Sequence, residues 1–299
     1  CPEMIDSESL RKIALFGTIP ENAVFCSYTV ESIYQVPLIL DEQGMGDFIC
    51  KRLGFSDRKP DFKEWRKFVD NVLNPEYEVK IALVGKYAGL ADSYVSMNEA
   101  LRHAGAACKA KVCIHYIEAE KFEQNPKSIE ILRDFDGIFV PYGFGPRGTE
   151  GKIMAIKFAR ENDVPFLGIC YGFQLAVIDS ARHVCGLKEA NSTEINPNSP
   201  YPVIDLMPEQ RGIEIKGATM RLGSHKIIIK PNSMAYTLYK SEEIYERHRH
   251  RFEVNLDYLK TLEKNGLVFS GKSADSRRME ILEMPDHFFF FASQFHGEF

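Results

Sequence analysis

Residues 166–174 of the chain, FLGICYGFQ, decide the fold class that the sequence predicts. Apolar residues up to position 169 are typical of the end of a buried strand, and the apolar positions after Cys170 have helical spacing (Leu175, Ala176, Ile178, Ala181, Val184). A strand that passes directly into a helix makes a tight turn at Cys170, where side chains on Gly168 or Gly172 would collide. The turn exposes the sulfur and places it at the helix N-terminus, which favours a thiolate. Cys170 is therefore a candidate nucleophile, although most free cysteines are simply small buried hydrophobes.

Strands and helices alternate on both sides of this stretch. The pattern predicts strands at 79–85, 111–117, 137–141 and 165–169, and helices at 93–107, 128–134, 150–161 and 171–185. Apolar strands separated by helices predict an α/β fold with a doubly wound, mostly parallel sheet. Ligands bind such sheets beyond the carboxyl ends of the strands, where Gly143 and Cys170 lie. After residue 186 the chain is richer in β-structure, with hairpin-like runs at 220–229 and 267–282.

The last residues supply partners for the thiol. An apolar strand over 288–293 leads into QFHGEF, with a histidine and a carboxylate two positions apart. Because residues i and i+2 of a strand face the same side, Glu298 can hold one nitrogen of the His296 ring while the other faces Cys170. The sequence therefore predicts a Cys170, His296, Glu298 triad.

The composition is that of an ordinary globular protein. The chain has 299 residues, 44% of them apolar, and a net charge of −5, which argues against a nucleic-acid partner. Arginine and histidine alternate over residues 247–251, which suits a small anionic ligand better than a phosphate backbone. Seven irregularly spaced cysteines without a CxxC pair predict a reducing compartment and neither disulfides nor a metal site. With no signal peptide and no apolar run of about 18 residues, we expect a cytoplasmic protein without a membrane span.

The first quarter of the chain is organised differently. Residues 1–54 predict a helix at 8–16, a strand at 23–28 and a helix at 44–53, which is too little to bury a core alone. Residues 55–76 form a predicted linker with a helix at 65–72, and the second domain spans 77–299.

A glycine-rich run, GFGPRG at 143–148, matches GxGxxG. A dinucleotide site is disfavoured because the run follows the third strand and Glu150 opens the helix where a pyrophosphate needs positive charge. A P-loop is disfavoured because the run from Gly145 to Lys152 has one residue too many between its glycines, and because Ile153 replaces the hydroxyl that binds magnesium.

Five stretches carry a family resemblance. GICYGFQ at 168–174 resembles the GxCxGxQ nucleophile elbow of class-I glutamine amidotransferases, which have a flavodoxin-like fold. GFGPRGTEGK at 143–152, ANSTE at 190–194, MRLG at 220–223 and ERHRHRFEVN at 246–255 resemble signatures of the CTP synthase family. The resemblance runs along the whole chain. It implies that residues 1–54 are a C-terminal remnant of an α/β amidoligase (synthetase) domain, and that several hundred preceding residues, P-loop included, belong to the parent.

The resemblance also implies site residues. Cys170, His296 and Glu298 would be catalytic, and the N–H groups of Gly143 and Tyr171 would form an oxyanion hole. Glutamine would be bound by Gly143, Tyr171, Gly172, Phe173, Gln174, Glu194 and Arg251, with Glu194 at the α-ammonium group. Tyr28, Thr29 and Val30 would be an adenine-binding remnant of the ATP site. Arg147 and Glu150 would belong to a lid that couples GTP to the site; a helix N-terminus whose charges, including Lys152, are simply solvated is the alternative.

The implied function is the glutaminase half-reaction of a CTP synthase. L-glutamine would be hydrolysed through a Cys170 thioester, and the ammonia would aminate UTP in the intact enzyme, with ATP and Mg²⁺ as substrates and GTP as activator. The fragment itself needs no cofactor; its partners would be the missing synthetase domain and, in the intact enzyme, a homotetramer and filaments. A γ-glutamyl hydrolase of the same fold and a non-catalytic regulatory or filament module remain alternatives. The chain departs from the family at Tyr142, usually glycine, and at Gly297, usually proline.

Overall fold

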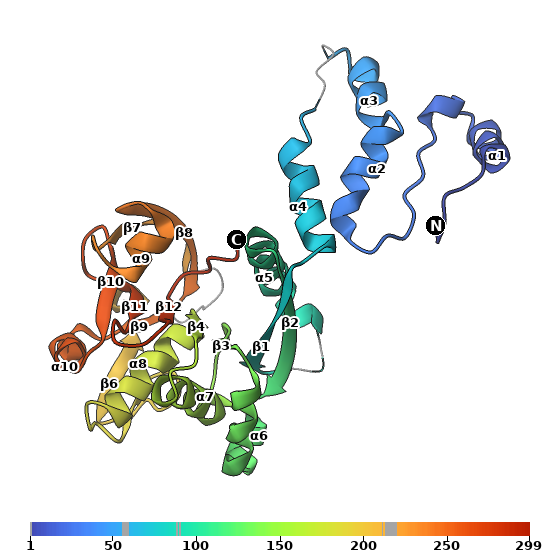
Figure 1. The fold of residues 1–299 in the computed structure, drawn as a ribbon. Coiled ribbons are helices and arrows are strands. Elements are labelled where there is room, and N and C mark those ends of the chain that lie inside the picture. Colours follow the sequence, from blue (N-terminus) through green and yellow to red (C-terminus); the bar gives the residue numbers. More distant parts are fainter. Residues whose placement is uncertain (1, 56–59, 88, 90, 211, 213–219) are drawn as a thin grey trace. The chain divides into compact units, whose positions relative to one another are not determined.

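The computed structural model describes residues 2–55, 60–87, 89, 91–210, 212 and 220–299 (Figure 1). The expected linker at 55–76 therefore lies partly outside the described residues, at 56–59. The chain divides into two compact units, Cys1–Glu78 with Leu101–Val112, and Val79–Ala100 with Cys113–Phe299. None of the helices in the described ranges is both long and apolar enough to cross a bilayer.

The first unit contains short helices, with the bounds α1 Ser7–Gly17, η1 Glu21–Ala23, η2 Ile33–Gln35, α2 Val36–Glu42, α3 Met45–Leu53 and α4 Lys63–Leu73. Asp6 caps α1 by accepting from the Ser9 N–H at 2.8 Å. The indole of Trp65 on α4 donates to the Tyr34 carbonyl at 2.9 Å. The predicted helices at 8–16, 44–53 and 65–72 are thus confirmed, whereas α2 was not predicted.

The predicted strand at 23–28 is wrong. No strand forms over those residues, because the backbone of Cys26 is bonded to a side chain instead: Gln43 accepts from the Cys26 N–H at 2.8 Å and donates to its carbonyl at 2.9 Å. A single glutamine therefore satisfies the groups that a neighbouring strand would otherwise pair.

A nine-stranded sheet organises the second unit, in the order β2-β1-β3-β4-β12-β11-β10-β7-β8. Strands β1, β3, β4 and β12 pair in parallel, and the strands from β12 to β8 pair antiparallel. The strand bounds are β1 Tyr77–Gly85, β2 Ala110–Glu118, β3 Gly137–Val140, β4 Phe166–Ile169, β7 Arg221–Ile229, β8 Glu243–His250, β10 Val268–Ser273, β11 Met279–Glu283 and β12 Phe290–Ser293. A second sheet has the order β5-β6-β9, with bounds β5 Ala190–Ser192, β6 Tyr201–Leu206 and β9 Phe252–Val254.

Helices and short 3₁₀ turns connect these strands. Their bounds are η3 Ala91–Tyr94, α5 Val95–Cys108, α6 Glu120–Gln124, η4 Pro126–Asp134, α7 Thr149–Glu161, α8 Tyr171–His183, η5 Pro208–Gln210, α9 Met234–Tyr239, η6 Leu256–Tyr258 and α10 Leu259–Lys264. The α/β fold class is confirmed, with a mixed sheet whose parallel half carries the elbow.

Both faces of the central strands are apolar. Phe290 and Ala292 of β12 belong to the large core that also contains α7 and α8, which lie side by side in Figure 1. Phe291, between them, belongs to a smaller core with Ile281 and with Ala235 of α9. Because successive strand residues point to opposite faces, α8 and α9 cover opposite sides of β12. The two cores therefore hold β4 and β12 from both faces, and the site lies beyond the carboxyl ends of these two strands.

Two further predictions need correction. Residues 128–134 lie in a 3₁₀ helix, η4, that begins at Pro126 instead of in an α-helix. Residues 220–229 do not form a hairpin, because β7 runs through them as one strand and α9 intervenes before its partner β8. The run at 267–282 is the hairpin of β10 and β11, as predicted.

Candidate active site

Cys170 lies in the turn between β4 and α8, as the sequence predicts, but it is buried, so the expectation of an exposed sulfur is wrong. Its backbone has φ 54° and ψ −95°, a conformation that non-glycine residues rarely adopt. The Cys170 N–H donates to the Ser293 carbonyl at 2.7 Å, and its own carbonyl accepts the Gln174 N–H at 3.2 Å. The C-terminal strand and the first turn of α8 therefore hold the strained residue from both sides. Strain of this kind persists only where the surroundings enforce it, and it is common at functional sites.

Gly172 permits the close approach that this turn requires. A Cβ atom at Gly172 would lie 2.1 Å from the Val140 carbonyl oxygen, far inside contact distance. Phe173, the next residue, is fully buried in the core. Neither Gly172 nor Phe173 is among the residues that line the cavity described below. Packing of the elbow against β3 accounts for both.

His296 and Glu298 lie in a turn after β12, not on a strand as expected. They nevertheless meet: the His296 Nδ1 atom lies 2.8 Å from a Glu298 carboxylate oxygen, and both side chains are almost completely buried. The His296 N–H donates to the Arg247 carbonyl at 2.8 Å, which ties the turn to β8. The turn therefore brings the pair together as a strand would have done.

The second ring nitrogen of His296 faces the thiol. Nε2 is buried and has no hydrogen bond of good geometry. Burial lowers the pKa of His296, but the interactions with Cys170 and Glu298 more than offset it and raise the pKa to about 9. A histidine whose pKa is raised in this way can accept the proton of a neighbouring thiol. The arrangement has the geometry of a thiol nucleophile, a base and an orienting carboxylate.

A cavity of about 360 Å³ opens onto the Cys170 sulfur. It brings together residues that are far apart in the sequence: Tyr142, Gly143, Phe144, Cys170, Tyr171, Gln174, Glu194, Met220, Arg247, Arg249, His250, Arg251, Phe252, His296 and Phe299. A space of this size suits a small polar molecule. It contains a carboxylate and several guanidinium groups besides the thiol and the imidazole.

Glu194 and Arg251 line this cavity from loops next to strands of the second sheet. Glu194 follows β5 and accepts from the Gly145 N–H at 3.1 Å, so it also holds the glycine-rich loop. Arg251 stands between β8 and β9 and donates to the amide oxygen of Gln210. A carboxylate and a guanidinium in one cavity can bind the ammonium and carboxylate groups of an α-amino acid.

Sequence reasoning identified Gln174 but missed Gln294. The Gln174 amide donates to the Phe252 carbonyl at 2.9 Å and to the Gln294 amide oxygen at 3.1 Å. The Gln294 amide nitrogen lies 3.8 Å from the Cys170 sulfur. These two buried glutamines join the elbow helix to the C-terminal turn. The position of Gln294, two residues before His296, was a signal that could have found it.

The glycine-rich loop is held against the elbow. The Tyr171 hydroxyl donates to the Gly145 carbonyl at 2.8 Å and lies 2.7 Å from the Thr149 hydroxyl. The Tyr142 hydroxyl donates to the Ser93 carbonyl at 2.9 Å, and its ring centroid lies 5.4 Å from that of His296. The Tyr142 ring thus packs against the imidazole of His296.

The residues expected at a lid and at an adenine site do not line this cavity. Arg147 is exposed and pairs with Glu120 at 2.7 Å, and Glu150 pairs with Arg182 at 2.7 Å. Tyr28, Thr29 and Val30 belong to the first unit and lie between η1 and η2 outside any helix or strand. The interpretation of Lys152 as a solvated charge is wrong, because the Lys152 side chain is fully buried.

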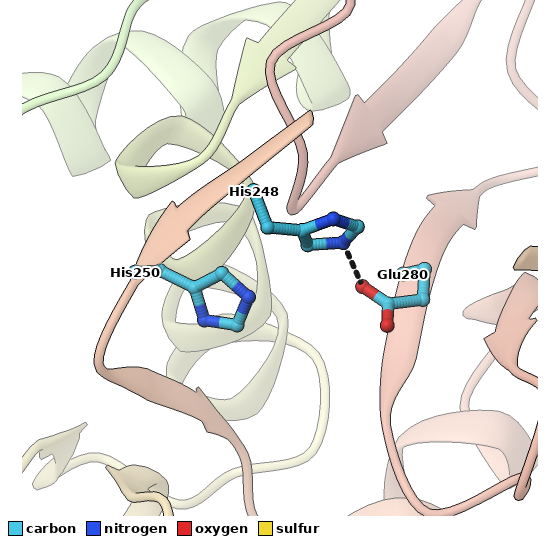
Figure 2. Close-up of side chains that lie close together, drawn as sticks. All are labelled: His248, His250 and Glu280. Carbon is cyan, nitrogen blue, oxygen red and sulfur yellow. Dashed lines mark hydrogen bonds and ion pairs between the residues drawn. The ribbon is translucent and has the colours of Figure 1, made fainter. Parts of the chain in front are cut away.

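His248 and His250 of β8 and Glu280 of β11 form a buried polar cluster (Figure 2). His248 Nε2 lies 2.9 Å from one Glu280 oxygen, and the Arg221 guanidinium donates to the other at 2.7 Å. The Arg221 guanidinium also lies 3.4 Å from His250 Nε2. The Nδ1 atoms of His248 and His250 lie 3.0 Å and 2.9 Å from backbone carbonyl oxygens. Burial lowers the pKa of His250 to about 3. His248, His250 and Glu280 have the residue types of a metal site, but the Arg221 guanidinium already supplies a cation to this carboxylate. The cluster fixes the strand whose alternate residues, Arg247 and Arg249, line the cavity.

Comparison with known proteins agrees with this site. A thiol elbow with a histidine and glutamate at the edge of a mixed sheet is the arrangement of class-I glutamine amidotransferases, and the model of that family matches residues 89–299. The chain therefore belongs to the class-I glutamine amidotransferase family. A second model, for the CTP synthase N-terminus, matches residues 1–55.

The individual relatives are CTP synthases. The chain is 55% identical to the CTP synthase of Thermococcus gammatolerans over 99% of its own length and 56% of that protein, and 50% identical to that of Methanopyrus kandleri over 100% of its own length and 56% of that protein. It thus spans about half the length of these relatives. A solved structure, the glutaminase domain of Trypanosoma brucei CTPS with bound acivicin, superposes with a TM-score of 0.69 at 40% identity over 74% of this chain and 86% of that one.

Proposed function

We propose that the chain hydrolyses the side-chain amide of L-glutamine to glutamate and ammonia. The observation that carries the proposal is the triad, in which the Nδ1 atom of His296 lies 2.8 Å from Glu298 and its Nε2 atom faces Cys170 at the floor of the cavity. Glu194 and Arg251 in the same cavity support an α-amino acid as the substrate.

Each step uses a group of the site. The Cys170 sulfur attacks the amide carbon, and its proton passes to His296 Nε2. The backbone N–H groups of Gly143 and Tyr171 stabilise the oxyanion; losing one such donor typically costs about 10²–10³ in rate. The carbon–nitrogen bond breaks as His296 returns the proton to the leaving ammonia. Water, deprotonated by His296, then attacks the thioester and releases glutamate and the thiol.

In the whole protein, we propose that the ammonia aminates UTP to CTP in an ATP-dependent reaction of a synthetase domain. The match of residues 1–55 to the N-terminal model of CTP synthases supports this, as do relatives of about twice the length. ATP with Mg²⁺ would act in that domain, and GTP would act as an activator. The residues of this chain would supply only the glutaminase chemistry.

The test compares three substrates with the wild-type chain and with Cys170→Ala. L-glutamine should yield equal amounts of glutamate and ammonia, whereas a γ-glutamyl peptide and L-asparagine should yield little product. Cys170→Ala should be inactive, and Lys157→Met, a change on the outer face of α7, should retain wild-type turnover. A preference for the γ-glutamyl peptide would instead identify a peptidase of the same fold, and absence of turnover with all three would refute the proposal.

A further inference from the structure

Lys152 is an unusual lysine. It lies in the first turns of α7, its side chain is 0% exposed, and its amine has no hydrogen-bond partner among the described residues. Lysines are rarely buried without a partner, because removing an ammonium group from water costs several kcal/mol. A methionine or leucine would fill the same space without that cost. The position therefore calls for a function of the amine itself.

The amine lies directly under the glycine-rich loop. Nζ is 3.1 Å from the point that a Cβ atom on Gly143 would occupy, and that point is 3.4 Å from the Tyr171 ring. Nζ lies 5.3 Å from the centroid of the same ring. The missing side chain of Gly143 thus leaves room for the amine, which lies against both residues whose N–H groups are proposed to hold the oxyanion.

The charged groups that act on this amine include the nucleophile. Burial lowers the pKa of Lys152, the nearby Lys86 lowers it further, and Cys170 and Glu118 raise it, for a value of about 7. Interactions of this kind are reciprocal. Negative charge at Cys170 promotes protonation of the amine, and a protonated amine promotes ionisation of the thiol.

We infer that Lys152 is a positioning residue of the site, whose buried amine takes up a proton from solvent water when negative charge develops at Cys170 and, as an ammonium, stabilises that charge from beside Gly143. This inference rests on the proposed thiol chemistry. Lys152 transfers no proton to the substrate and touches no reacting atom; the proton of the thiol still passes to His296. The function of the lysine is to supply positive charge beside the cavity only when negative charge is present.

The test measures the reactivity of Cys170 without glutamine. Wild type, Lys152→Met, Lys152→Leu and the control Lys157→Met are treated with iodoacetamide from pH 5.5 to 9.5, and alkylation of the Cys170 peptide is followed by mass spectrometry. At pH 6 both Lys152 variants should react about threefold or more slowly than wild type, because they lack the positive charge that stabilises the negative charge of the reacting sulfur. The difference should vanish above pH 9, because the pKa of Lys152 is about 7 and its amine is then neutral in the wild type as well. Thermal unfolding identifies any variant that fails to fold.

The outcomes separate this inference from the proposed function. Equal alkylation of wild type and both folded variants at every pH would overturn the function of Lys152, even if the wild type hydrolyses glutamine. A constant ratio that persists above pH 9 would also overturn it, because it would indicate altered access to the sulfur. If the wild type fails to hydrolyse glutamine, the proposed function fails, while a pH-dependent difference in alkylation would still support the link between Lys152 and Cys170.

Discussion

Replacing Cys170 with glycine and with alanine measures the strain of the elbow. The φ of 54° with ψ of −95° costs a residue with a Cβ atom about 1–3 kcal/mol. Glycine avoids that cost, but it loses about 0.5–1 kcal/mol more conformational entropy on folding. It also lacks one buried carbon, worth about 0.8 kcal/mol. The balance leaves Cys170→Gly about 0.5 kcal/mol more stable than Cys170→Ala, and neither variant has a nucleophile to complicate the comparison.

Urea unfolding of the two variants provides the assay, and Ala176→Gly is the matched control. Ala176 lies six positions after Cys170, is fully buried and has the ordinary helical conformation of α8. There, glycine costs about 1 kcal/mol in helix propensity plus the same buried carbon. The difference between the two sites should therefore be about 2 kcal/mol. If glycine destabilises position 170 relative to alanine as much as it destabilises position 176, the elbow is not strained and the explanation for its geometry is wrong.

Three further predictions concern other parts of the site. Gly172→Ala should lower the free energy of unfolding by about 2 kcal/mol or more, as in an overpacked core, because its Cβ atom would lie 2.1 Å from the Val140 oxygen. Circular dichroism during denaturation measures this free energy, and a change under about 0.5 kcal/mol would contradict the prediction. Glu298→Gln should lower the pKa of His296 by about a unit and glutamine turnover by about 100-fold, followed by NMR of the ring and by ammonia release; an unchanged ring pKa would show that the carboxylate does not act on the imidazole. The pKa of His250 is about 3 in the folded chain and 6.5 in its ordinary state, so the unfolded chain binds more protons between these two pH values. The free energy of unfolding should therefore fall by up to about 1.4 kcal/mol per pH unit as the pH drops through that window. His250→Gln should show a shallower fall, and an equal fall would assign the effect to other groups.

Periodicity predicted the elements that form the parallel half of the sheet. The strand at 165–169 and the helix at 171–185 correspond to β4 and α8, and the turn between them is as tight as predicted, whereas the strained backbone of Cys170 was not predicted. Such elements are predictable because their apolar spacing is a local property of the chain. The resemblance to known motifs supplied Glu194 and Arg251, which the structure places in one cavity although 57 positions separate them in the sequence.

Contacts between distant segments account for what the sequence did not predict. The strand expected at 23–28 is absent because Gln43 bonds the backbone of Cys26, and no local pattern reveals such a contact. The alternative that Lys152 is a solvated charge at a helix N-terminus is wrong, because its side chain is fully buried and its amine lies beside Gly143. Gln294 was overlooked because its partner Gln174 lies 120 positions earlier in the chain. Burial and long-range pairing depend on the folded chain as a whole.

In the proposed mechanism, Cys170 forms a thioester with the γ-glutamyl group of glutamine, and His296 acts as the base. The most direct test of this mechanism is to mix the chain with excess isotopically labelled L-glutamine, stop the reaction in acid within the first turnover, and locate the label by peptide mass spectrometry. A γ-glutamyl group is expected on the peptide that contains Cys170 in the wild type, little of it in His296→Ala, and none in Cys170→Ala. Glutamine turnover without a label on Cys170, or a label of equal amount on another cysteine, would contradict the mechanism.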